Sequence, residues 1–360
     1  PTHAITDDGD KIHIDPYLCQ GCGTCMLVCP SGAVSSNPIL DDDPLERICS
    51  ELGSCPDPSQ VCVLLYDTLL AQKRLEDMKC GLRTKIVPIA LRELSTLGME
   101  AWLTALSCGA GKVVLLSGAH VTQNSMRSLE QQIAFTRSML AGMGFNPNRL
   151  CIIQFEKCRD FSDAFGIETS SPVMGAVAFN RLNGKRKNID KAMRRLVCLA
   201  PKPCVDEVRL GAGAPFGGLS IDKEKCTLCM GCVKPCPTSA LRRAGELSDP
   251  KLGFVESLCV QCGICASACP EQAIRLAPRM VYDLQLRKEV QILNESPPFK
   301  CISCGRPFTT RAIVELMSER LGDNPFFQGD AINKLKQCPD CRSHYNVIEQ
   351  LERVTGNQGE

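Results

Sequence analysis

The chain has 360 residues, 25 of them cysteine, and its 41 basic residues balance 40 acidic ones. A formal charge of +1 without a polybasic block argues against wrapping a nucleic acid backbone or docking on an anionic membrane. The longest apolar runs, such as 113–116, are far shorter than the roughly 20 residues that span a bilayer. We therefore expect no membrane span and no nucleic acid partner.

The cysteines indicate metal ligation, because 16 of the 25 lie in clusters with C-x2-C spacing. A secreted disulfide scaffold is short and spreads its cysteines along the chain, whereas tight pairs are typical of metal sites. Thiolates must stay reduced to hold a metal, so the pattern predicts a cytoplasmic protein.

The first 40 residues form one ferredoxin-like half-module. They contain a run of the form C-x2-C-x2-C-x3-C-P, which is the bacterial-type [4Fe-4S] ligand run. Its members are Cys19, Cys22, Cys25, Cys29 and Pro30. The strand-like residues 11–15 precede the run, as expected for the second half of a two-cluster module.

The beginning of the chain repeats the ending of such a run, because Pro1-Thr2-His3-Ala4-Ile5 matches Cys29-Pro30-Ser31-Gly32-Ala33-Val34 without its cysteine. We expect an upstream run, so that Cys29 ligates a cube completed outside this chain and the cube of Cys19, Cys22 and Cys25 lacks its fourth ligand here. Two alternatives remain: Cys29 closes its own cluster, or Cys49, Cys55 or Cys62 supplies the fourth ligand in its place.

Residues 41–205 alternate apolar strands with amphipathic helices. The pattern predicts strands over 61–66, 86–90, 113–117 and 150–155, with helices over 68–80, 98–107 and 122–141. Units of this length favour a parallel, three-layer α/β domain. Such a sheet binds ligands at the carboxyl ends of its strands, here near 117–120. The basic run 185–187 is expected to be a solvated turn, with a patch for an acidic redox partner as the alternative.

Residues 206–282 carry two further runs, which start 33 residues apart. The first consists of Cys226, Cys229, Cys232 and Cys236, and the second of Cys259, Cys262, Cys265 and Cys269. Paired runs exchange their fourth ligands. One cube is thus assigned to Cys226, Cys229, Cys232 and Cys269, and the other to Cys259, Cys262, Cys265 and Cys236. With its C-P-x-x-A-aliphatic endings, the segment 219–280 resembles the two-cluster bacterial ferredoxin family.

Residues 283–360 contain a third kind of cysteine pattern. Two C-x2-C pairs, Cys301 with Cys304 and Cys338 with Cys341, predict a tetrahedral S4 site that clamps a helix over 311–321. Zn²⁺ is the expected metal. A rubredoxin-like iron and unmetallated thiols are the alternatives, and His344, interpreted as a surface residue, is a possible replacement ligand.

The order of parts resembles a family of large proteobacterial 4Fe-4S proteins encoded beside molybdenum-dependent formate dehydrogenases. The stretches that carry the resemblance are 15–25, Ala214–Gly217 and Phe299–Phe308. The resemblance implies electron transfer in or around formate oxidation, with formate dehydrogenase as a partner.

Together these patterns predict an α+β multidomain protein with ferredoxin modules flanking the α/β domain. The expected segments are 1–40, 41–205, 206–282 and 283–360. The cofactors are two complete [4Fe-4S] clusters in 206–282, one or two more involving 19–29, and zinc. The leading hypothesis is a carrier that relays single electrons between redox enzymes without catalytic side chains. The alternatives are a maturation factor for a molybdenum enzyme and a flavin-dependent oxidoreductase subunit fed by the clusters.

Overall fold

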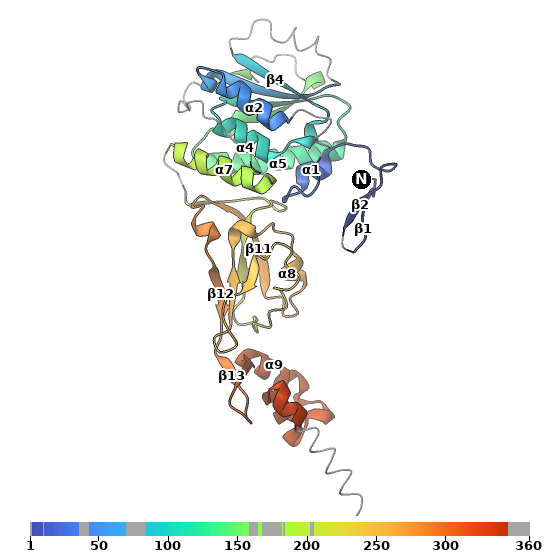
Figure 1. The fold of residues 1–360 in the computed structure, drawn as a ribbon, viewed down its shortest axis with the longest axis vertical. Helices are drawn as coiled ribbons and strands as arrows, with labels where there is room; N and C mark the ends of the chain where they lie inside the picture. Colours follow the sequence, from blue (N-terminus) through green and yellow to red (C-terminus); the bar gives the residue numbers. More distant parts are fainter. Residues whose placement is uncertain are drawn as a thin grey trace, which may run out of the picture. The chain divides into compact units, whose positions relative to one another are not determined.

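The computed structural model describes residues 2–9, 11–35, 43–69, 84–157, 165–167, 182, 184–201 and 205–344. The chain divides into two compact units (Figure 1). The first consists of Pro1–Ala214 with Arg279–Leu284, and the second of Pro215–Pro278 with Gln285–Glu360. No helix in the described part of the chain is long and apolar enough to cross a membrane.

Four parallel strands form the main sheet of the first unit, in the order β4, β3, β5, β6. Their bounds are β3 Val61–Asp67, β4 Lys85–Leu91, β5 Lys112–Ser117 and β6 Leu150–Gln154. Val63 of β3 pairs with Val87 on one side and Val113 on the other. A parallel sheet is covered on both faces, which is why its strands are apolar runs. The four predicted strands are confirmed to within one residue at each end.

Three helices pack on this sheet, and a fourth packs on one of them. The helices α2 (Pro44–Gly53), α4 (Met99–Ser107) and α5 (Gln123–Gly142) contact strands, while α7 (Lys185–Leu199) covers α4. The prediction of a turn at 185–187 is wrong, because these residues form the first turn of α7. The helix predicted over 68–80 lies almost wholly outside the described residues.

The first unit also contains the N-terminal cysteine run. The strands β1 (Ile5–Asp7) and β2 (Ile12–Ile14) form an antiparallel hairpin, and the short helix α1 (Thr24–Val28) lies inside the run. The strand β7 (Glu207–Arg209) pairs with Arg279–Val281. Single-turn helices complete the unit: η1 Pro58–Gln60, η2 Leu94–Thr96, η3 Pro147–Arg149 and η4 Phe155–Lys157.

The second unit begins with short antiparallel strands around the other two runs. These are β8 Gly217–Ile221, β9 Leu241–Arg243, β10 Lys251–Phe254, β11 Ile274–Val281 and β12 Gln291–Glu295. The strand β10 lies between β9 and β12, and β8 pairs with β11. The helical segments are η5 Glu256–Leu258, α8 Ile264–Ser267 and η6 Leu286–Lys288. Leu241, Leu252, Phe254 and Ile274 form a core together with ligand-run cysteines.

The remainder of the second unit is a hairpin followed by a helix. The hairpin consists of β13 (Pro298–Lys300) and β14 (Pro307–Thr310), and α9 (Arg311–Gly322) follows at once. Thr310 caps α9 by accepting a hydrogen bond from Ile313 N, and it donates one to the buried carbonyl of Thr227. The helix predicted over 311–321 is therefore confirmed. The 3₁₀ helices η7 (Pro325–Phe327) and η8 (Gly329–Lys336) lead back to the hairpin.

Candidate metal centres

Two cavities in the second unit are each lined by four cysteines, three from one run and one from the other. One cavity is lined by Cys236, Cys259, Cys262 and Cys265. The second cavity is lined by Cys226, Cys229, Cys232 and Cys269. These are the same two sets of four that the spacing of the runs predicts. The fold therefore brings three cysteines of one run and the fourth of the other to the same cavity.

Apolar side chains surround both cavities. Leu219, Leu241 and Phe254 line the first cavity, and Leu252 and Ile274 line the second. Cys229 and Cys262 are exposed, whereas Cys232 and Cys259 are buried, so each set of cysteines has one side toward solvent.

The backbone between the cysteines is left-handed at the same positions in each run. The second residue after the first cysteine and the residue directly after the second cysteine both have positive φ. They are Gly21 and Gly23, Leu228 and Met230, and Gln261 and Gly263. Left-handed backbone costs about 1 kcal/mol for a residue with a side chain. Its repetition indicates a constraint, because such turns make a concave nest of amides that suits an anionic cluster.

The alanine that ends each run has a structural role. Ala33 N donates to Cys29 Sγ at 3.3 Å, and Ala273 N donates to Cys269 Sγ at 3.4 Å. Although burial raises the pKa of Cys29, hydrogen bonds from the Ser31 hydroxyl and backbone amides lower it to about 7. The C-P-x-x-A ending thus stabilises the thiolate form, which is the form that binds iron.

The buried cysteines need a positive partner. Burial, together with neighbouring thiols, raises the pKa of Cys232 to about 12 and that of Cys265 to about 11. Four thiolates in an apolar cavity repel one another, and a metal cluster supplies the positive charge that offsets this repulsion. The cavities, the amide nests and the donor set therefore fit [4Fe-4S] clusters.

The N-terminal hairpin repeats a hairpin of the second unit in register. Ile5 pairs with Ile14 in β1 and β2, as Leu241 pairs with Phe254 in β9 and β10. The hydrogen bond from Asp15 N to Ala4 O, 2.8 Å long, matches that from Val255 N to Ala240 O. However, the apolar face is open here: Ile5, Ile12 and Ile14 are 46%, 53% and 37% exposed, against 2%, 1% and 0% for Leu241, Leu252 and Phe254.

The alternative ligands proposed for the first run have other partners. Cys49 Sγ lies 4.0 Å from Cys108 Sγ, and Cys55 bonds to Glu51 O and to Lys85 Nζ. Cys62 is fully buried within β3. These contacts give no support to a substitute ligand from this group.

The carboxyl edge of the parallel sheet holds a hydrogen-bonded histidine–aspartate pair and the first cysteine run. His120 Nε2 lies 2.7 Å from Asp67 Oδ2, and Asp67 is fully buried at the end of β3. Burial, followed by the charge of Asp67, raises the pKa of the nearby Glu93. The helix α1 contacts η2, which follows β4, and α5, which follows β5. The predicted ligand-binding edge is thus where the first cysteine run lies.

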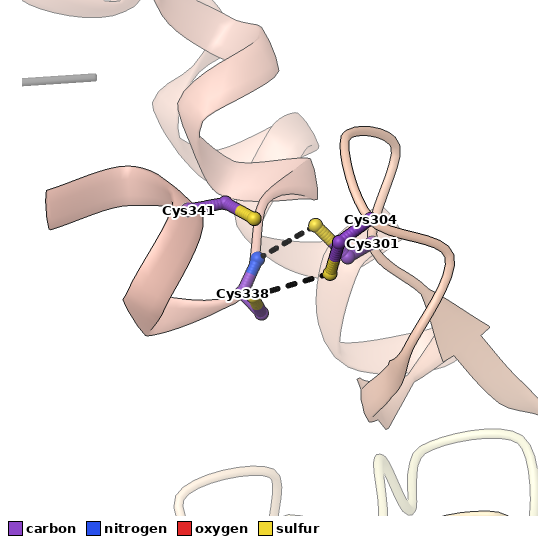
Figure 2. Close-up of side chains that lie close together, drawn as sticks. All are labelled: Cys301, Cys304, Cys338 and Cys341. Atoms are coloured by element: carbon purple, nitrogen blue, oxygen red, sulfur yellow. Dashed lines mark hydrogen bonds between the residues drawn. The ribbon is translucent and has the colours of Figure 1, made fainter. Parts of the chain in front are cut away.

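The C-terminal cysteines form a much tighter group. The sulfur atoms of Cys301, Cys304, Cys338 and Cys341 all lie within 4.8 Å of one another, the one such group of ligand atoms found among the described residues (Figure 2). Cys304 Sγ and Cys338 Sγ are 3.8 Å apart. Metal–sulfur bonds of about 2.3 Å in a tetrahedron place sulfur atoms about 3.8 Å apart, so the group fits a single metal ion.

Backbone amides support this group. Cys338 N donates to Cys301 Sγ at 3.3 Å, which joins the two C-x2-C loops (Figure 2). Burial raises the pKa of Cys301, but hydrogen bonds from the amides of Cys338, Cys304 and Ser303 lower it below its ordinary value. His344 is exposed and does not belong to the group.

Comparison with known proteins agrees with the cysteine runs. Residues 12–35, 219–242 and 253–275 each match the family described as 4Fe-4S binding domain. No curated relative matches the chain. The chain is ferredoxin-like over these three segments and carries more than one site for a 4Fe-4S cluster.

Proposed function

We propose that this protein is an iron–sulfur electron carrier that relays single electrons between redox enzymes. The observation that carries the proposal is the pair of cavities in the second unit, each lined by three cysteines of one run and the fourth of the other. Two such sites in one small unit provide successive positions for an electron.

In this proposal the cysteines of the three runs hold the clusters and the surrounding residues control them. A [4Fe-4S] cluster supplies reversible uptake of one electron. The apolar lining limits water, and the amide nests donate hydrogen bonds to sulfur; both affect the potential. Gln261 adds a side-chain donor, because its Nε2 lies 3.3 Å from Cys259 Sγ. No side chain has to act as an acid, a base or a nucleophile.

The position of α1 favours a carrier over a flavin-dependent enzyme. A flavin or substrate in the α/β domain is expected at the carboxyl edge of the sheet. There α1 contacts both η2 and the helix α5. An iron–sulfur loop at this edge gives the α/β domain a role in holding a cluster.

We assign the C-terminal cysteine group to a structural zinc. The four sulfur atoms, the tetrahedral separation and the amide support match a closed S4 site. The proposed partners are redox proteins in the cytoplasm. Formate dehydrogenase is proposed among them because of the resemblance carried by 15–25, 214–217 and 299–308.

Iron and sulfide analysis with EPR on the anaerobically purified chain tests this function. We expect clusters that are reduced one electron at a time, and that are reduced by formate in the presence of a molybdenum formate dehydrogenase. The variants C236S and C262S are expected to alter the same EPR signal, whereas C269S and C229S alter the other. Cys198, an exposed residue of α7, provides the control variant C198S.

Clusters that cannot be reduced would contradict the carrier proposal. If a strain lacking the protein has a formate dehydrogenase without its molybdenum cofactor, the protein acts in maturation instead. A normal cofactor content with slow electron delivery supports the carrier.

A further inference from the structure

The first cysteine run is packed on the α/β domain. Within α1, Leu27 is only 2% exposed, whereas α8, the corresponding helix of the third run, has no buried residue. A Cβ on Gly23 would meet Ser95 and Thr96 of η2 at 3.0 Å. The loop therefore lies directly against the domain, and side chains of the domain reach its cysteines.

Three hydroxyl groups connect the first turn of α5 to a ligand cysteine. Thr122 Oγ1 lies 3.0 Å from Ser125 Oγ, and Ser125 Oγ lies 2.8 Å from Thr24 Oγ1. Thr24 Oγ1 in turn lies 3.5 Å from Cys22 Sγ. We call this series the hydroxyl relay. Ser125 is 3% exposed, so water does not readily replace it.

The hydrogens of the relay have one consistent direction when Cys22 binds iron. The thiolate has no hydrogen, so the Thr24 hydroxyl donates to sulfur and accepts from Ser125. The Ser125 hydroxyl in turn accepts from Thr122 Oγ1, which itself accepts the amide of Ser125. Hydrogen bonds in a series polarise one another, so Ser125 strengthens the donor at sulfur.

The relay belongs to the first run alone among the three. The residues at the position of Thr24 are Gly231 in the second run and Ile264 in the third, and neither has a hydroxyl group. The three otherwise similar loops therefore differ in the polar groups that the fold brings to their cysteines.

We propose that Ser125 of the α/β domain, acting through Thr24 on Cys22, raises the reduction potential of the first iron–sulfur centre. This rests on the proposed function. Hydrogen bonds to cluster sulfur stabilise the reduced, more negative state. Cys22 is a ligand whichever residue is fourth, so the inference is independent of that choice. Ser125 is a positioning residue, because it acts on sulfur through Thr24.

Redox titration followed by EPR tests the relay in the full chain. The C22S variant identifies the signal of the first centre by its loss or change. The variants S125A and T24V remove the two hydroxyls, and T24S keeps one. The matched control is S138A in the same helix, because the Ser138 hydroxyl donates to Ala134 O and takes no part in the relay.

We expect T24V to make reduction of the first centre about tenfold less favourable, a shift of about 59 mV to more negative potential for one electron. S125A should shift it in the same direction by less, and the double variant should match T24V because the groups act in series. T24S and S138A should keep the wild-type potential. The centres of the second unit should not change in any of these variants.

If the reduction potential of the first centre is the same in S125A and T24V as in the wild type, the inference is wrong. Equal shifts of the reduction potential in all centres would also contradict the inference, because they indicate a general structural effect. If the wild-type chain holds no reducible cluster, the proposed function fails as well, and this is seen before any variant is made.

Discussion

The side chain of Lys185 is held against α1, a contact that the sequence around Lys185 does not predict. Its Nζ donates to Met26 O at 2.8 Å and to Leu27 O at 2.7 Å, at the last turn of α1. Glu100 Oε2 lies 3.5 Å away, and the two side chains are only 10% and 13% exposed. A cation stabilises carbonyls at a helix C-terminus that have no partner within the helix.

Replacing Lys185 by Met should destabilise the first unit by about 2–4 kcal/mol, because it leaves two carbonyls and the Glu100 carboxylate without their partner. The single tryptophan, Trp102, lies buried in α4 and reports unfolding of this unit by fluorescence in urea. We also expect K185M to lose iron from the first centre.

Lys187 provides the control, since it lies in the same helical turn and is exposed. K187M should change stability by less than about 0.5 kcal/mol. The double variant K185M/E100Q should regain part of the lost stability, because the unpaired charge is removed. Equal stabilities of K185M and K187M would show that the buried lysine does not hold the loop.

Sequence reasoning identifies the cysteines but not the residues that modify them. Three cysteines of each set follow from short spacing, and the fourth follows from the exchange between paired runs, so the sets of Cys226 and Cys259 can be grouped without a structure. Ser125 lies 101 residues from Thr24, and Lys185 lies 159 residues from Met26. No local pattern marks either contact, and the basic run 185–187 gives no sign in the sequence that one of its lysines is buried against α1.

At the scale of elements, the strands of the α/β domain were the most predictable part. β3 and β5 are continuous apolar runs because helices cover both faces of a parallel sheet, and Gly144 marks the end of α5 with its φ of 83°. The sequence does not show that α1 lies at the carboxyl edge, because this depends on packing between distant elements.

The C-terminal end of α5 makes a close contact with the segment 279–284 of the same unit. The Tyr282 hydroxyl donates to Met139 O at 2.7 Å in a buried position. Burial raises the pKa of Tyr282, which keeps the hydroxyl protonated as a donor. A Cβ on Gly142 would overlap the Tyr282 hydroxyl, so the glycine provides the space for this hydrogen bond.

This geometry predicts coupling between the two residues. Y282F should lower the free energy of unfolding by only about 1 kcal/mol, because Met139 O still accepts a hydrogen bond from Met143 N. G142A should lower the free energy of unfolding by about 1–3 kcal/mol, because the added methyl group overpacks this contact. The double variant should be less destabilised than the sum of the two, because removing the hydroxyl makes room for the methyl group. Urea unfolding monitored at Trp102 measures the cycle, and strict additivity would contradict the contact.

At the scale of the whole molecule, the chain contains two kinds of thiolate site that differ in size. The C-terminal sulfur atoms converge within 4.8 Å, as a single ion requires, whereas the described cysteines of the ferredoxin runs line two cavities without forming so close a group. Two C-x2-C pairs bring their four sulfur atoms to one point, whereas each run of four in the second unit places three cysteines in one cavity and the fourth in the other. This difference follows from spacing, so the sequence predicts which cysteines group together in each kind of site.

Removing the metal from the C-terminal site should release residues 323–344 without loss of the clusters in the second unit. Cys304 is exposed, whereas Cys301 and Cys338 are buried, so C304S breaks the site with the least disturbance of packing. The helix α9 should remain attached through Thr310 to Thr227 O and through Arg320 to Glu271, whose atoms are 2.7 and 2.6 Å apart.

We expect one zinc per wild-type chain, and none in C304S or after chelation. Trypsin should then cleave after Lys334 and Lys336, which the metal protects because Ile302 N bonds to Lys336 O beside the site. Iron content should stay at the wild-type level, and C198S should retain both zinc and protection. Full zinc binding by C304S would contradict the four-cysteine site, and iron in place of zinc would indicate a rubredoxin-like centre. Loss of iron together with zinc would show that the C-terminal site supports the clusters. The change would then be transmitted through the hydrogen bond from Thr310 to Thr227, the residue after Cys226.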